Sequence, residues 1–184
     1  MLPAANVKFT PFTEDMKKTH TILIPGMLPM HFSLLQAALV SCGYKAEVLH
    51  NTGREVIETG LKYVNNDICY PALLVIGQLI NALESGKYDL EHTALIITQT
   101  GGGCRASNYI YLLRKALEKA GLTHIPVINL NVNGLEQQPG FHLDASMVHK
   151  FLAAVVYGDT LMYLTNKTRP YEVVHGAADR LAQK

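Results

Sequence analysis

Residues 94–104 read Ala94-Leu95-Ile96-Ile97-Thr98-Gln99-Thr100-Gly101-Gly102-Gly103-Cys104, and this stretch decides the fold. Its first five residues form an apolar, β-branched run that predicts a buried strand. The glycine-rich loop leads into a segment with Ile110, Leu113 and Leu117 at helical spacing, and Gly121 is placed to end that helix. A strand joined to a helix in this way is half of a parallel βαβ unit.

The same alternation of strand and helix extends in both directions. Short apolar runs predict further strands at 21–24, 45–50 and 125–129. Apolar spacing and helix-breaking residues predict helices from Pro29 to Gly43, around 56–64, over 72–85 and over 145–164. We expect Asp67 to cap the helix over 72–85 and Pro71 to lie in its first turn. These elements predict an α/β protein with a three-layer, open, mostly parallel sheet of flavodoxin-like or Rossmann-like type and helices on both faces.

Length and composition fit one domain. The chain has 184 residues, of which 48% are hydrophobic, so it has enough apolar side chains for a core and is not intrinsically disordered. We expect a lead-in or linker over 1–19, a single α/β domain over 20–172 and a C-terminal tail over 173–184.

The charge balance excludes several classes of function. The formal net charge of +1 leaves no electrostatic footprint for nucleic acid or an anionic membrane. No run approaches the roughly 18–20 apolar residues of a membrane span, and the first residues lack a secretory pattern, so we expect a cytoplasmic protein.

Cys42, Cys69 and Cys104 are widely spaced. They predict metal binding, redox chemistry or plain burial rather than a disulfide framework.

Two cysteine-bearing loops are expected at the carboxyl edge of the sheet, where α/β folds bind ligands. Cys69 precedes the helix over 72–85, and Cys104 follows the strand over 94–98. We expect both at helix starts, where the helix dipole lowers the pKa of a thiol. Gly101, Gly102 and Gly103 remove every Cβ from the approach to Cys104, and Arg105 adds positive charge. Further candidate hydrogen-bonding residues near these loops are Asp67, Gln99 and Asn108.

Simpler interpretations stay open for these features. A single cysteine at a helix start is more often a small buried hydrophobe than a ligand, although two in equivalent loops favour a function. A glycine-rich loop also suits a phosphate, but the Lys-Ser/Thr pair of a P-loop and the dinucleotide spacing are missing, so we predict no nucleotide site. Cys42 continues an apolar helix face and predicts a packed core thiol. The eight histidines are expected mostly on surfaces and receive no role.

Three motifs together resemble a known family. They are Asn65-Asn66-Asp67-Ile68-Cys69-Tyr70-Pro71, Gln99-Thr100-Gly101-Gly102-Gly103-Cys104-Arg105-Ala106-Ser107-Asn108-Tyr109 and Tyr157-Gly158-Asp159. From about His20 to about Glu172, the chain resembles the dehydratase-like region of CoA-substrate-specific enzyme activase-related proteins. These proteins are relatives of the 2-hydroxyacyl-CoA dehydratase and benzoyl-CoA reductase systems. The cysteine motifs are long and unusual, which makes the resemblance specific.

The resemblance implies an iron–sulfur-binding domain in ATP-driven, low-potential electron transfer. Dehydratase-like subunits of this superfamily bind a cluster through cysteine thiolates, and an ATP-hydrolysing activator supplies the electron. Carried over here, Cys69 and Cys104 are the candidate ligands of a 4Fe-4S-type cluster. The Gly101–Gly103 loop would let the cluster approach, and Arg105 and Asn108 would shape its site.

Two thiolates are half of the usual four, so further ligands are needed. They are expected from another domain, from a second copy in a homodimer that shares one cluster, from Cys42, or from substrate and water. The chain shows no ATPase motif, and we expect it to work with an ATPase activator module or further domains of a larger protein rather than alone.

Two rival functions stay open. One is a non-catalytic scaffold or partner-docking domain of a larger activase-related protein, which would hold no iron. The other is a thiol-nucleophile enzyme that uses Cys104, for which no histidine lies nearby in the sequence.

Overall fold

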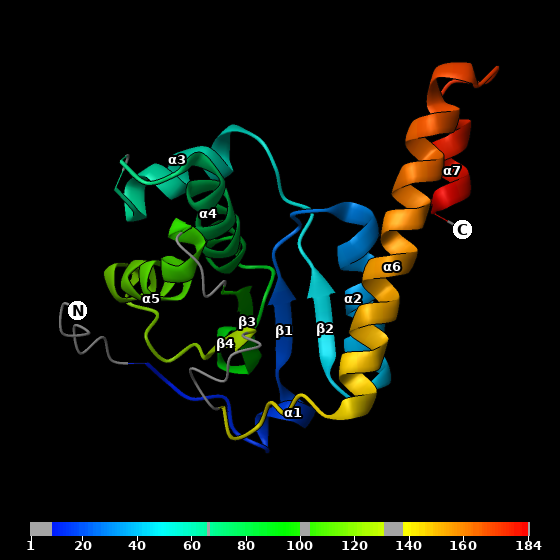
Figure 1. Cartoon of the computed structure of the whole chain (residues 1–184). Coiled ribbons are helices and arrows are strands. Elements are labelled where there is room, and N and C mark those ends of the chain that lie inside the picture. Colours follow the sequence, from blue (N-terminus) through cyan, green and yellow to red (C-terminus); the bar gives the residue numbers. More distant parts are fainter. Residues whose placement is uncertain (1–8, 66, 100–103, 131–137, 184) are drawn as a thin grey trace. The chain divides into compact units, whose positions relative to one another are not determined.

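The structure is a computed structural model, and it describes residues 9–65, 67–99, 104–130 and 138–183 (Figure 1). The chain divides into two compact units. The sheet unit contains Met1–Gly26 and Gly43–His142, and the helical unit contains Met27–Cys42 and Leu143–Lys184.

The sheet unit is built on a parallel sheet of four strands. The strands are β1 (Thr21–Ile24), β2 (Lys45–Val48), β3 (Thr93–Thr98) and β4 (Val127–Leu130). They lie in the order β2-β1-β3-β4, and every neighbouring pair is parallel. The predicted α/β class with an open parallel sheet is confirmed. Because the strand order reverses between β1 and β3, the carboxyl ends of these two strands flank the position where such sheets bind ligands.

Burial explains why these short runs became strands. In β3 the first five residues are buried, as expected for a central strand that is covered on both faces. β2 lies at the edge of the described sheet and starts with the exposed Lys45, which discourages pairing with another chain. It ends at Val48, two residues before the predicted end, although the N–H of Leu49 still donates to the carbonyl of Ile24.

Helices precede or connect these strands within the sheet unit. They are α1 (Met16–Thr19), α3 (Arg54–Tyr63), α4 (Tyr70–Glu84) and α5 (Tyr109–Ala120), with the 3₁₀ helices η1 (Leu90–His92) and η2 (Arg105–Asn108). The lead-in also joins this unit, because Phe12 is fully buried and its N–H donates to the side-chain oxygen of Gln138.

The main core lies between the sheet and α4 and α5. Leu23, Leu95, Ile97 and Val127 project from the strands into one cluster with buried side chains of both helices. α4 is apolar on most sides and holds ten buried residues. α3 packs on α4 so closely that Gly60 and Gly77 have no room for a Cβ.

The N-terminus of α4 differs from the prediction. Cys69, not Asp67, is the N-cap residue, and Pro71 occupies the first turn as expected. Asp67 lies earlier, in a turn where its N–H donates to the Asn65 side chain and the N–H of Ile68 donates to the Asn65 carbonyl. The turn around Asn65 therefore takes Asp67 away from the helix end.

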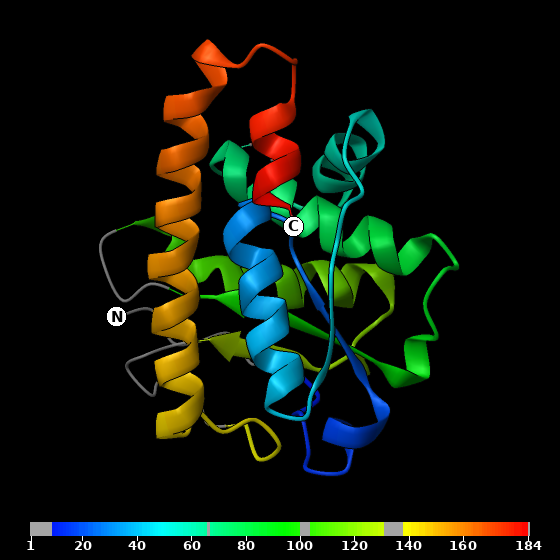
Figure 2. The same ribbon diagram turned by 90° about the vertical axis from the view of Figure 1, so that its right-hand side faces the viewer.

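The helical unit contains α2 (Pro29–Ser41), α6 (Ala145–Thr168), the 3₁₀ helix η3 (Arg169–Tyr171) and α7 (Ala177–Ala182). Figure 2 shows α2 and α7 alongside α6. α6 continues four residues beyond the predicted end at Leu164, because Thr165 still packs on its buried face. Among the described residues, no helix is both long and apolar enough to cross a membrane.

A buried histidine joins α2 to α6 and is an exception to the expectation, otherwise confirmed, that the histidines lie mostly on surfaces. His31 is 6% exposed, and its Nε2 lies 2.9 Å from Oδ1 of Asp159. Its ring rests on Gly158, where an added Cβ would come within 2.6 Å of the ring. The Gly158-Asp159 pair of the third motif therefore has a packing role in this unit.

Candidate functional site

Cys69 is held at the start of α4 by the backbone around it. Its carbonyl accepts hydrogen bonds from the N–H groups of Ala72 and Leu73, at 3.1 and 3.2 Å. Pro71 has no N–H to leave unpaired, which suits the first turn. The Cys69 side chain is half-buried and packs against the main core. The predicted placement of this thiol at a helix N-terminus is correct, so the positive end of the helix dipole faces it.

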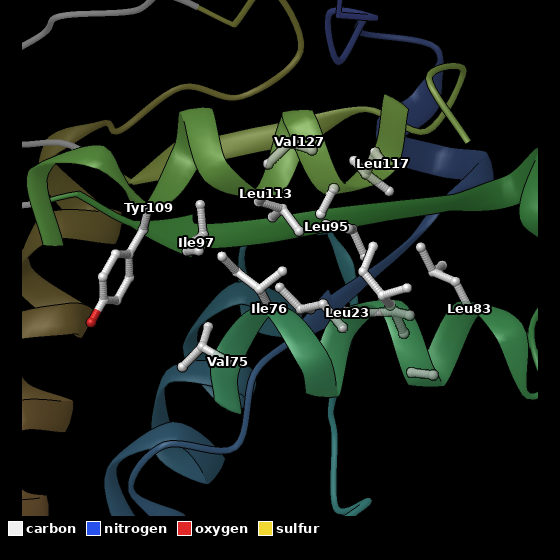
Figure 3. Close-up of a cluster of buried hydrophobic side chains, with 14 of the residues drawn as sticks. Leu23, Val75, Ile76, Leu83, Leu95, Ile97, Tyr109, Leu113, Leu117 and Val127 are labelled. Carbon is white, nitrogen blue, oxygen red and sulfur yellow. The ribbon is translucent and has the colours of Figure 1, made fainter. Parts of the chain in front are cut away.

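Tyr109 brings the start of α5 to the same place. Its hydroxyl oxygen lies 3.4 Å from Sγ of Cys69, across a sequence separation of 40 residues. Figure 3 shows its ring next to Ile97, with the hydroxyl pointing away from the aliphatic side chains. Tyr109 is the last residue of the second cysteine motif, but its role was not predictable from the sequence.

The phenol of Tyr109 also interacts with the second cysteine. Burial, the hydrogen bond to Cys69 and the negative charges of ionised Cys69 and Cys104 together raise the pKa of Tyr109 to about 12. Both predicted thiols therefore lie within electrostatic reach of one buried hydroxyl. The phenol stays protonated, and able to donate a hydrogen bond, throughout the neutral pH range.

Cys104 has a different local setting from the predicted one. It is exposed and directly precedes η2, while α5 begins five residues later, at Tyr109. The Cys104 carbonyl accepts hydrogen bonds from the N–H of Ser107 at 3.1 Å and from its hydroxyl at 2.7 Å. The prediction of an α-helix N-terminus at this thiol is wrong, because the four residues between it and α5 form a single 3₁₀ turn.

A chain of amides connects this turn to the sheet. The Gln99 side chain follows β3, and its Nε2 donates to the carbonyl of Ser107 at 2.6 Å. The Asn129 side chain on β4 donates in turn to Oε1 of Gln99. Asn129 is 7% exposed, and its own Oδ1 has no hydrogen-bond partner among the residues that the structure describes. The sequence analysis expected a hydrogen-bonding role for Gln99 but missed Asn129, which stands out as an amide within the apolar run 127–130.

The other predicted site residues contribute less to this geometry. Asn108 is exposed and is the N-cap of α5, but its side chain makes no capping hydrogen bond. Arg105 begins η2, and its side chain lies outside the described part of the chain. Gly101, Gly102 and Gly103 also lie outside the described residues.

Cys42 belongs to the helical unit and is not a packed core thiol as predicted. It is the C-cap of α2 and half-buried, and Nζ of Lys150 donates to its sulfur at 3.6 Å. The polar contact with Lys150 explains why this position is not purely apolar. The predicted place at the end of the helix is correct.

The donor set suits a soft metal centre but is incomplete. Thiolates favour zinc, copper(I) and iron–sulfur clusters, and Cys69 and Cys104 supply two of them. Among the described residues, no group of three or more His, Cys, Asp or Glu side chains is arranged to hold a metal ion. The site can therefore provide half of a four-thiolate ligand set.

Comparison with models of protein families, with curated proteins and with solved structures finds no match to this chain. The family resemblance of the three motifs stays a prediction.

Proposed function

We propose that this chain is the iron–sulfur-binding domain of a 2-hydroxyacyl-CoA dehydratase or activase-type system, with a role in ATP-driven, low-potential electron transfer. One observation carries the proposal. The Tyr109 hydroxyl lies 3.4 Å from Sγ of Cys69, and Cys104, on a separate connection of the sheet unit, is close enough to influence the same hydroxyl electrostatically. A packing role would not need both sulfurs near one polar group, nor an exposed Cys104.

The residues around the site have separable roles in this proposal. Cys69 and Cys104 are the metal ligands, and an iron–sulfur cluster bound there would supply one-electron transfer at low potential. The Ser107–Gln99–Asn129 chain holds the backbone of the Cys104 turn against the sheet. The apolar side chains beside Tyr109 exclude water from one side of the site and so influence the potential.

The missing ligands come from a second polypeptide in this proposal. A homodimer that shares one cluster would supply two thiolates from each copy, and a partner domain would supply its own. The homodimer predicts that iron loading and dimerisation rise together, as measured by light scattering and iron assay on the same fractions. A monomer that carries a full cluster would contradict it.

The decisive experiment is anaerobic reconstitution of the full chain with iron and sulfide, followed by assays of both elements and by visible and EPR spectra. The variants are Cys69→Ser and Cys104→Ser, and Cys42→Ser is the matched control because that thiol lies in the helical unit. We expect iron and sulfide in near-equal amounts in the wild type and in Cys42→Ser. Both should be lost in the other two variants. A wild-type protein that binds no iron would overturn the proposal.

A partner-docking domain is the second candidate, and the outer face of α6 favours it. This face turns away from α2 and exposes large apolar side chains. Leu152, Val156 and Tyr163 are 62%, 65% and 61% exposed. Exposed apolar patches of this kind often mark protein interaction sites. Failure of iron loading together with a helix-dependent complex in a pull-down would favour this function, and Leu152→Lys should then abolish the complex.

A further inference from the structure

The hydroxyl of Tyr109 is the buried polar group in direct contact with a proposed ligand. Its ring is one of the core side chains, while its oxygen lies 3.4 Å from Sγ of Cys69. A phenylalanine would fill the same volume, so the hydroxyl itself adds nothing to the apolar packing. Its contact with Cys69 is the contribution that calls for an explanation.

Metal binding fixes the direction of this hydrogen bond. In the free protein, either the thiol or the phenol can be the donor. A metal-bound cysteine has lost its proton, so its sulfur can only accept. Tyr109 must then donate, and hydrogen bonds to a ligating sulfur are one of the means by which proteins set the potential of a cluster.

We propose that Tyr109 is a positioning residue for the metal centre, which donates to the Cys69 sulfur and makes this thiolate a weaker electron donor than it would be without the hydrogen bond. The inference rests on the proposed function. The bond orients the Cys69 side chain and stabilises the lone pairs of its sulfur. The hydroxyl thereby raises the reduction potential of the group that Cys69 binds.

The test uses Co²⁺ as the probe, because its bonds to thiolates give sulfur-to-metal charge-transfer bands in the near ultraviolet. The reduced, metal-free full chain is titrated anaerobically with Co²⁺ as wild type, Tyr109→Phe and Tyr111→Phe. Tyr111 is the matched control because it lies on the same helix and is exposed. Thermal unfolding of each variant shows that it is folded. Two further proteins, Cys69→Ser and the double variant of Cys69→Ser and Tyr109→Phe, complete a double-mutant cycle between Cys69 and Tyr109.

We expect Tyr109→Phe to shift the charge-transfer band to lower energy, since a sulfur without the hydrogen bond gives up electrons more easily. Tyr111→Phe should leave the band where it is. In the Cys69→Ser background, Tyr109→Phe should cause no shift. The iron-reconstituted Tyr109→Phe protein should also have a more negative reduction potential than the wild type.

Three other results would overturn the inference. A band that is identical in the wild type and in Tyr109→Phe would overturn it and leave the proposed function intact. A shift that persists in the Cys69→Ser background would show that the hydroxyl does not act through Cys69. A wild-type chain without any cobalt–thiolate band would overturn the proposed function and this inference together.

Discussion

Single residues decide how closely the elements around the site can approach. At Gly77 on α4, an added Cβ would lie 2.3 Å from the carbonyl oxygen of Val56 and 2.9 Å from the N–H nitrogen of Gly60. Both neighbours are backbone atoms of α3 and cannot turn aside. The close packing of α3 on α4 therefore depends on glycine at this position. Cys69 lies in the connection between these two helices.

We predict that Gly77→Ala lowers the free energy of unfolding by about 1–3 kcal/mol, as overpacking of a close-packed interior does. Urea unfolding monitored by circular dichroism measures it. The control is Gly86→Asn, just past the end of the same helix, where φ is +72° and no atom lies within 4 Å of a new Cβ. Asparagine tolerates this conformation, so we expect a change below about 1 kcal/mol. Equal losses of unfolding free energy in Gly77→Ala and Gly86→Asn would contradict the close packing of α3 on α4 at Gly77.

Asn129 provides a second prediction at this scale. In Asn129→Ala, Oε1 of Gln99 loses its donor while it stays partly buried, which costs about 1–3 kcal/mol of unfolding free energy. The change should also accelerate hydrogen exchange at the N–H of Ser107, because Gln99 no longer holds that turn. Asn108→Ala is the control, since the exposed Asn108 side chain makes no capping hydrogen bond. If hydrogen exchange at the N–H of Ser107 were unchanged in Asn129→Ala, the chain of amides would not be what holds the Cys104 turn.

The positions of the two thiols could be predicted from the sequence, whereas the residues that contact them and support their turns could not. Pro71 and the glycine-rich loop pointed to the places where Cys69 and Cys104 lie, since both are local signals. Tyr109 and Asn129 act across 40 and 30 residues, on Cys69 and Gln99. Such contacts depend on strand order and helix packing, for which one sequence contains no direct signal.

At the scale of elements, the end of α5 followed local chemistry, whereas the start of β4 did not. α5 ends at Gly121 in the left-handed conformation, as predicted, because glycine adopts it without strain. β4 begins two residues later than predicted, at Val127, although Ile125 is buried. Burial of an apolar side chain is what the sequence pattern reports, whereas a strand also needs hydrogen bonds to its neighbour.

A charged contact ties β2 to the connection after α4 and gives a pH-dependent prediction. Oε1 of Glu47 lies 2.8 Å from Nζ of Lys87 and accepts from the Tyr88 hydroxyl at 2.7 Å. The hydrogen bond from Lys87 and then that from Tyr88 hold the pKa of Glu47 below its usual value. A lowered pKa in the folded state means that the ionised form adds stability at neutral pH. This contribution disappears as the pH falls through the folded-state pKa.

We therefore predict that Glu47→Gln is less stable than the wild type at pH 7, by no more than about 1 kcal/mol because the pair is largely exposed. The difference should shrink as the pH falls below the ordinary range of a glutamate pKa. Urea unfolding across this pH range measures it, with Glu118→Gln on the exposed side of α5 as the control for a lost charge. A stability difference between the wild type and Glu47→Gln that grows toward acid pH would contradict the lowered pKa of Glu47.

At the scale of the whole molecule, α6 has one exposed face and one buried face. Substitutions on the exposed face should change surface properties, and substitutions on the buried face should change stability. Val156 lies on the exposed face, whereas Ala154 is buried on the face toward α2. We predict that Val156→Lys changes the unfolding free energy by less than about 0.5 kcal/mol and reduces the binding of a hydrophobic dye. Ala154→Lys should destabilise the chain strongly, because it buries a charge. Equal stability of the two variants would show that α6 has no buried face.

The positions of Cys69 and Cys104 have a consequence for the order of assembly. The two thiols come from successive connections, and their common neighbour Tyr109 reaches Cys69 once β3 has joined the sheet and both α4 and α5 have packed on it. A zinc finger folds around its ion. Here the contact between Tyr109 and Cys69 needs no bound ion, so a cluster of the proposed kind would enter a domain that has already folded.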